Sequence, residues 1–142
     1  MHRILYRIAA FSAALSVIIG AFGAHFLKTI LTLESLNSIH TAVNYQMIHS
    51  LAIIAVGLLY SHYHQKKIGL SGYLFIAGII FFSGSIYLLA LLNYLGFERS
   101  AFIGLLTPIG GLFFIFGWFL LFLGIPIEHT YIKKSRRQNE ES

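Results

Sequence analysis

Four long runs of apolar residues, separated by short polar segments, constrain this chain more than any other feature of its sequence. Each run reaches the roughly 20 residues that a helix needs to cross the hydrocarbon core of a bilayer. Hydrophobic residues make up 57% of the 142 residues and charged residues only 11%, whereas soluble domains are about 45–50% apolar and about 25% charged. The sequence therefore predicts a helical membrane protein.

The runs place four transmembrane helices at about 4–26, 39–60, 70–92 and 101–125, with Asn37 or Ser38 as the N-cap of the second. Because the connections are short, the predicted fold class is all-α, a four-helix transmembrane bundle with up-down-up-down order. Residues 1–126 then form one membrane domain, and 127–142 a polar, basic cytoplasmic tail that we expect to be disordered. A cleaved signal peptide is the alternative for the first run, but its length favours a retained span.

The distribution of Lys and Arg predicts the orientation of the bundle. Two such residues lie in the N-terminal leader at 1–7, two in the loop at 61–69 and four in the tail, against Lys28 and Arg99 in the other two connections. Basic residues flank the cytoplasmic side of membrane spans. Both termini are therefore expected to be cytoplasmic, in the inner (plasma) membrane of the cell.

Residues 40–50, at the start of the second span, carry several hydrogen-bonding side chains where apolar residues are expected. At 100° per residue, Tyr45, Gln46 and His49 share one helical face, and Asn44 lies with His40 on the opposite face. A polar side chain in hydrocarbon costs roughly several kcal/mol unless it finds a partner. We therefore expect Gln46 and His49 to form hydrogen bonds to the first or third span, with His25, Ser83 or Ser85 as their partners.

The predicted orientation brings further polar residues into the same outer half of the bundle. This polar cluster comprises His25, Asn44, Tyr45, Gln46, His49, Ser83, Ser85 and Thr107. One interpretation is structural, with interhelical hydrogen bonds that hold the helices in register. The other is a binding site, because polar groups inside a bundle often mark the path of a ligand or ion.

Small residues predict where the helices approach one another closely. They are Ser16, Gly20 and Ala24 in the first span, Gly84 in the third, and Gly110 and Gly117 in the fourth. Pro108 should kink the fourth helix and free the carbonyl of Gly104, for which the Thr107 hydroxyl is a candidate partner.

Four segments of the predicted outer half resemble those of a known family. They are Gly20-Ala21-Phe22-Gly23-Ala24-His25, Tyr45-Gln46-Met47-Ile48-His49, Phe82-Ser83-Gly84-Ser85-Ile86-Tyr87 and Thr107-Pro108-Ile109-Gly110-Gly111. In these the chain resembles the bacterial family called domain of unknown function 423, and it is similar to the eukaryotic transmembrane protein 256. The resemblance covers all four spans and implies a small multi-pass inner-membrane protein, without an activity. The family often carries a charge where this chain has the neutral Asn44, so the resemblance does not imply a charge requirement here.

The chain lacks the residues that several classes of function require. The chain has no Cys and no Asp, and its five Glu residues lie in loops or the tail, so no buried carboxylate is available to orient a catalytic His. His40 and His49 cannot bind one metal ion from opposite helix faces. The basic residues flank spans and form no extended patch for nucleic acid. We therefore expect no enzyme, no metal, no cofactor and no nucleic-acid partner.

Two hypotheses for function remain. The first is a non-catalytic accessory or scaffold subunit, or a binder of a lipid or hydrophobic small molecule at the polar cluster, with a membrane-protein partner or a homo-oligomer also compatible. The second is a small transporter or channel with the polar cluster along its permeation path. A path needs polar residues on both sides of the midplane, and the chain is apolar at 51–59 and 112–123, which favours the first hypothesis.

The orientation is directly testable, because the chain has no native cysteine. A single cysteine introduced in the tail should stay unlabelled by a membrane-impermeant thiol reagent applied to intact cells, and should label after the membrane is permeabilised. Labelling from outside intact cells would contradict the predicted orientation.

Overall fold

The computed structural model describes residues 2–97 and 101–126 and is helical almost throughout that part of the chain. The letter η denotes π-helical segments. The elements are α1 (His2–Phe22), η1 (Gly23–Leu27), α2 (Lys28–Ile30), α3 (Leu33–Tyr63), α4 (Lys66–Gly78), η2 (Ile79–Ser83), α5 (Gly84–Tyr94) and α6 (Ala101–Gly124).

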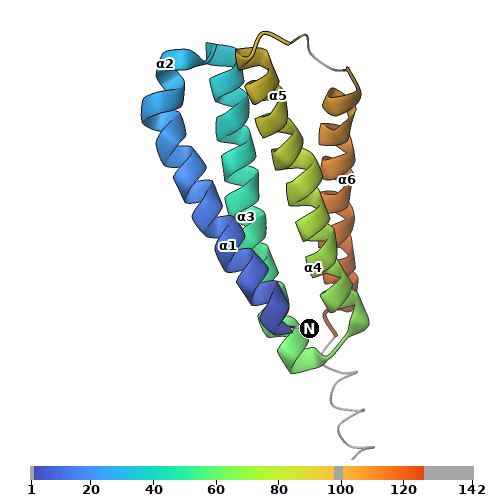
Figure 1. Cartoon of the computed structure of the whole chain (residues 1–142). Coiled ribbons are helices and arrows are strands. Elements are labelled where there is room, and N and C mark those ends of the chain that lie inside the picture. The colour runs from blue at the N-terminus through green and yellow to red at the C-terminus, as the bar shows by residue number, and fades with distance from the viewer. Residues whose placement is uncertain (1, 98–100, 127–142) are drawn as a thin grey trace, which may run out of the picture.

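Four helical stretches are long and apolar enough to cross a membrane, as the sequence predicts. They are Arg3–Ile30, Leu33–Tyr63, Lys66–Tyr94 and Phe102–Gly124. They lie side by side in one elongated bundle, and α1 packs mainly on α3 while α4 packs mainly on α6 (Figure 1). The all-α four-helix fold class is confirmed. The tail expected to be disordered, residues 127–142, lies outside the described residues.

The second long helix starts earlier than predicted. Thr32 is its N-cap, and its side-chain oxygen accepts a hydrogen bond of 3.2 Å from the backbone N–H of Ser35. Ser38, a predicted cap, instead lies inside α3 and donates to the carbonyl of Glu34. The sequence around 33–38 is polar enough to resemble a loop, but the buried side chains of Leu36 and Ile39 pack this extra turn onto the bundle.

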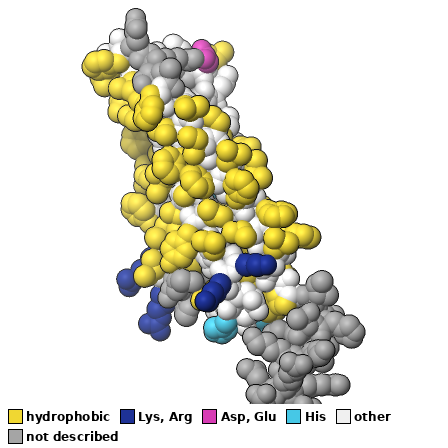
Figure 2. Space-filling view, turned by 90° about the vertical axis from the view of Figure 1, so that its right-hand side faces the viewer, with side chains coloured by type: hydrophobic (Ala, Val, Ile, Leu, Met, Phe, Trp, Pro, Cys, Tyr) yellow, Lys and Arg dark blue, Asp and Glu magenta, His cyan; other side chains and the backbone are white. Residues whose placement is uncertain are grey.

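Apolar side chains fill the half of the bundle nearest the N-terminus. The buried core there consists of Leu5, Ala9, Ala52, Ile53, Val56, Ile68, Phe75, Phe114 and Leu121. Hydrophobic side chains also cover much of the outer surface, with Lys and Arg gathered at this end in the view of Figure 2. An apolar surface of this kind fits a protein surrounded by lipid.

Glycines of α6 allow its close contact with the α4–η2 helix. A Cβ atom on Gly117 would lie 2.6 Å from the Phe75 ring, and one on Gly110 would meet the backbone N of Phe82 and lie 2.7 Å from its Cα. Gly20 of α1 also faces its neighbour, since a Cβ there would lie 3.3 Å from Val43. Ser16 is fully buried. These four predicted packing residues lie at helix contacts.

Two of the predicted packing residues do not lie at helix contacts. They are Ala24 and Gly84, which are both exposed. A Cβ atom added to Gly84 would find no atom nearer than the Ile79 carbonyl of its own helix, at 4.0 Å. Each residue follows or lies within a π-helical segment, η1 or η2. A π-turn bonds residue i to i+5 and so rotates the following side chains away from the α-helical stripe. A stripe projected at 100° per residue therefore fails at these positions.

The close contact at Gly110 predicts that substitution of this glycine destabilises the protein, and Gly104 in the same helix provides a matched control. Gly110→Ala should lower the free energy of unfolding by about 1–3 kcal/mol, because backbone atoms of Phe82 cannot yield to the new methyl group. Gly104→Ala in the same helix meets no atom within 4 Å, and should be neutral or stabilise by roughly 0.5–1 kcal/mol. Unfolding in mixed micelles measures both. Equal stability of the two variants would contradict this contact.

Candidate functional site

Gln46 links three of the four long helices through its side-chain amide. Its Nε2 donates to the backbone carbonyl of Ser12 in α1 at 2.9 Å, and its Oε1 accepts from the Tyr87 hydroxyl of α5 at 2.8 Å. Gln46 is only 2% exposed. Its expected bonds to the first and third spans are thus present, with Ser12 and Tyr87 as partners instead of His25, Ser83 or Ser85.

Serine hydroxyls add further contacts around this amide. Ser50 Oγ lies 2.8 Å from Ser12 Oγ and 2.7 Å from the Gln46 carbonyl. Ser83 Oγ donates to the carbonyl of Ala42 at 2.9 Å, which ties η2 to α3. Ser12 was not among the expected partners of Gln46, because a serine in a helix ordinarily bonds its own preceding turn.

His49 joins α3 to α6, whereas we expected a bond to the first or third span. Trp118 Nε1 donates to His49 Nε2 at 3.2 Å, and His49 Nδ1 lies 2.8 Å from the Tyr45 carbonyl. An indole N–H only donates, so Nε2 must be the acceptor and Nδ1 carries the proton. These two bonds together select one neutral tautomer of His49.

Aromatic rings surround His49. Its ring stacks on Phe114, with centroids 3.6 Å apart and planes at 12°, and Phe75 lies at a centroid distance of 5.4 Å. Tyr45 packs on Phe82 at 4.7 Å but is 43% exposed. The histidine is therefore held by packing as well as by hydrogen bonds, and its ring has little freedom to rotate toward a ligand.

Ser85 and Thr107 form the contact between α5 and α6. Their hydroxyl oxygens lie 2.7 Å apart, and Ser85 Oγ donates to the carbonyl of Phe82 at 2.9 Å. Since a hydroxyl has one proton, Thr107 is the donor to Ser85. The Thr107 hydroxyl is thus committed to a neighbouring helix rather than to the carbonyl of Gly104.

Two residues of the predicted cluster lie outside it. His25 and Asn44 are both exposed, on η1 and on the outer face of α3. The π-turn of η1 changes the direction of His25, and Asn44 lies on the helical face opposite Gln46. The structure brings together Gln46, His49, Ser83, Ser85 and Thr107, with Tyr45 at the edge.

The buried polar atoms of this cluster already have partners. Within residues 2–97 and 101–126, no buried side-chain nitrogen or oxygen lacks a hydrogen bond, and no three His, Cys, Asp or Glu residues lie together as a metal site. A ligand that bonded these atoms would have to displace an interhelical bond. The geometry suits a structural frame, and the expected absence of metal and cofactor stays a prediction.

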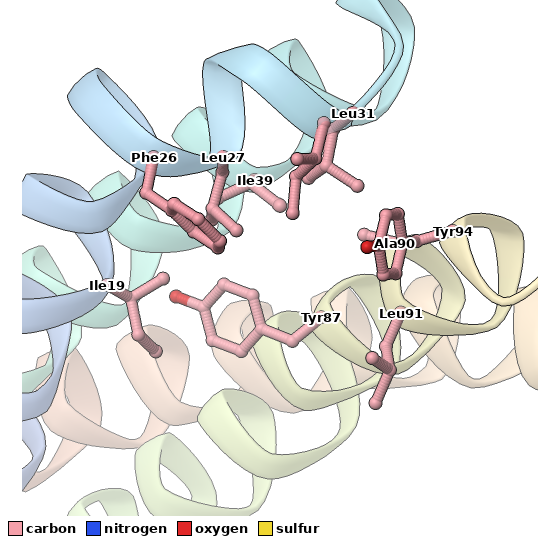
Figure 3. A pocket seen from close by; sticks show the side chains of 10 residues that line it. Ile19, Phe26, Leu27, Leu31, Ile39, Tyr87, Ala90, Leu91 and Tyr94 are labelled. Carbon is pink, nitrogen blue, oxygen red and sulfur yellow. The ribbon is translucent and has the colours of Figure 1, made fainter.

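An apolar pocket lies beside this frame, at the end of the bundle away from the N-terminus. Its volume is about 400 Å³, within the roughly 300–1,000 Å³ of ligand pockets. In Figure 3 Tyr87 extends toward Ile19 and Phe26, and Tyr94 and Leu91 lie along the same helix. The lining residues are Ile19, Phe26, Leu27, Ile30, Leu31, Ile39, Tyr87, Ala90, Leu91 and Tyr94.

Sequence reasoning missed this pocket, because its lining looks like ordinary span residues. The walls come from α1, η1, α2, α3 and α5, and no single segment carries a pattern that marks them. The break between α2 and α3 at Leu31 and Thr32, where the backbone is extended, places the apolar residues of η1 and α2 opposite α5.

The fold and the apolar surface define a multi-pass helical membrane protein. The sequence profile described as "Protein of unknown function (DUF423)" matches residues 19–111. The chain belongs to this family.

Three relatives, each named a UPF0382 membrane protein, illustrate the similarity. One from Staphylococcus saprophyticus is 40% identical over 117 residues, covering 82% of this chain and 92% of its own. One from Haemophilus influenzae is 42% identical, covering 82% and 89%. One from Schizosaccharomyces pombe is 43% identical, covering 80% and 94%. No solved structure matches.

The Gln46–Tyr87 hydrogen bond predicts energetic coupling between two helices. Gln46→Leu should lower the free energy of unfolding by about 1–3 kcal/mol, because it leaves the Tyr87 hydroxyl without its acceptor. In a double-mutant cycle with Tyr87→Phe, the coupling should be about 0.6–1.7 kcal/mol. Unfolding in mixed micelles provides the four energies. Additivity within about 0.3 kcal/mol would contradict the bond.

Proposed function

We propose that this protein is a non-catalytic lipid-binding protein of the inner (plasma) membrane, which holds an apolar chain of a membrane lipid in the pocket between η1 and α5. The observation that carries the proposal is the pocket itself, about 400 Å³ in volume and lined almost wholly by apolar side chains. Apolar walls favour an apolar occupant, since burying a polar group there would cost its hydrogen bonds to water.

The rim of the pocket supports entry from the surrounding bilayer. Phe26, Leu91 and Tyr94 line it and are 57%, 54% and 52% exposed. Side chains that line a pocket and also face the outside give an apolar ligand a continuous apolar route from lipid. An acyl chain can therefore enter sideways without crossing water.

The polar frame supports the pocket by fixing its back wall. The Tyr87 ring lines the pocket while its hydroxyl donates to Gln46. Because Gln46 is bonded in turn to α1, the helices that carry Ile19 and Tyr87 are held at a set separation. The polar cluster then acts through the shape of the pocket, and the ligand itself contacts apolar atoms.

The distribution of polarity favours binding over permeation. The buried cluster lies near the middle of the bundle, and between it and the N-terminal end Leu5, Ile53, Val56 and Phe75 fill the interior with no exposed surface. A transporter or channel needs polar groups along the whole path. With the predicted orientation, the pocket belongs to the outer leaflet, at the end away from Arg3, Arg7, Lys66 and Lys67.

Native mass spectrometry of the gently solubilised protein tests the proposal. The wild-type chain should carry one bound molecule with the mass of a membrane lipid. Ile19→Trp fills the pocket from α1, and should weaken the affinity for lipid about tenfold, which corresponds to a loss of about 1.4 kcal/mol, and so lower the occupied fraction.

Leu88→Trp is the control, because Leu88 is 42% exposed on the same helix as Tyr87 but does not line the pocket. It should keep the bound lipid. A wild-type chain without bound lipid, or equal loss in both variants, would contradict the proposal, and a bound small molecule of another mass would replace lipid as its ligand.

A further inference from the structure

The outer face of α3 carries a stripe that no other described helix covers. Its members recur at alternating spacings of four and three residues and are all exposed. They are Asn37, Thr41, Asn44, Ile48, Leu51, Ala55 and Leu58. At 100° per residue they lie within about 100° of arc, opposite the buried face that holds Gln46 and Ile53. We call these seven residues the α3 stripe.

The spacing of the α3 stripe is that of a helix-pairing seam. Apolar residues that repeat every 3.5 residues on average are what two helices need to pack along their length. The lower part is apolar, with Ile48, Leu51 and Leu58 exposed by 55%, 55% and 59%. Ala55 lies between them and permits close approach. Lipid would cover an apolar face equally well, so the polar residues of the α3 stripe are what distinguish lipid from a second helix as its neighbour.

The side-chain amide of Asn44 has no hydrogen-bond partner in the acyl chains of lipid. Its side chain is exposed, and no hydrogen bond to its amide is found within the described residues. The midpoint of α3 is Ile48, so Asn44 lies only about 6 Å along the axis from the middle of the span at 1.5 Å per residue. With the middle of α3 placed at the bilayer midplane, that position is inside a hydrocarbon core about 30 Å thick, where no water is available.

We propose that the α3 stripe is a dimerisation surface, on which a second copy of this chain pairs so that the two Asn44 amides hydrogen-bond to each other. An amide side chain carries both a donor and an acceptor, so Asn44 complements itself. Asparagine at a seam position is a known means of fixing the register of paired helices.

Membrane topology makes this self-pairing geometrically consistent. Two copies inserted in one orientation are related by a two-fold axis along the membrane normal, so their α3 helices run parallel. Each residue of the α3 stripe then lies at the depth of its own counterpart, and Asn44 faces Asn44. The lipid pocket is unaffected, because Ile39 lines it from the opposite, buried face of α3.

Cysteine cross-linking in native membranes tests the surface, and the cysteine-free chain provides a clean background. Ile48→Cys and Ala55→Cys should each give a disulfide-linked dimer under mild oxidation. Ile80→Cys is the matched control, since Ile80 is 61% exposed at the middle of the α4–α5 helix. It should stay monomeric. Equal cross-linking at Ile80, or none at the α3 stripe, would overturn the proposal.

A second measurement tests the role of Asn44 itself. In liposomes at varied protein-to-lipid ratio, Förster transfer between labelled copies should show Asn44→Leu to dimerise about tenfold more weakly than the wild type. Asn44→Gln keeps the amide and should retain most of the affinity. The Asn44 side chain is exposed, so neither change disturbs the core.

The outcomes separate a self-pairing surface from the other occupants. Unchanged dimerisation of Asn44→Leu would overturn the role of the amide. A purified wild type that stays monomeric at all ratios would overturn the proposal and assign the α3 stripe to another membrane protein or to lipid. Lipid binding at the pocket is measured separately, so failure here leaves the proposed function intact.

Discussion

The side-chain amide of Gln46 is the interaction on which the arrangement of the helices depends. Apolar contacts hold membrane helices together with little preference for one rotation or depth, because lipid tails are as apolar as leucine. Directional bonds remove that freedom. Gln46 bonds α1 through the Ser12 carbonyl and α5 through Tyr87, while its neighbour His49 accepts from Trp118 of α6. One short segment of α3 thus contacts each of the other long helices.

The two ends of the bundle are stabilised in different ways. Toward the N-terminus, side chains such as Phe75 pack against glycines of α6 in a dry core. Toward the other end, polar pairs such as Ser85 with Thr107 replace that packing, and an apolar pocket remains between η1 and α5. The hydrogen bonds of Gln46 connect the helices on either side of the pocket, whereas in the core the helices are positioned by side chains that fill the space between them.

The sequence was sufficient to predict a membrane protein with a four-helix fold, because the bilayer sets the length and composition of each span. Both are recognisable even where the exact ends or turns of a helix are predicted wrongly. It was also sufficient to single out Gln46 and His49, whose polarity conflicts with their surroundings. It was insufficient to identify the hydrogen-bond partners of these two residues. Ser12 and Tyr87 look like ordinary span residues, and two π-turns rotate Ala24, His25 and Gly84 away from the faces that a constant helical period assigns.

The contrast between Gln46 and Asn44 follows from one rule applied inside and outside the bundle. Both are amides two residues apart on α3, and both lie where water is absent. Gln46 faces inward and is fully bonded within the chain, with 2% of its surface exposed. Asn44 faces outward, where the described part of this chain offers its amide nothing. The Gln46 amide positions the helices of one chain because it needs hydrogen-bond partners away from water. The Asn44 amide has the same need, but on the outer surface of the bundle. We propose that its partner comes from another molecule, and the alternation of four and three residues along the same face is the surface on which we expect an identical helix to pack.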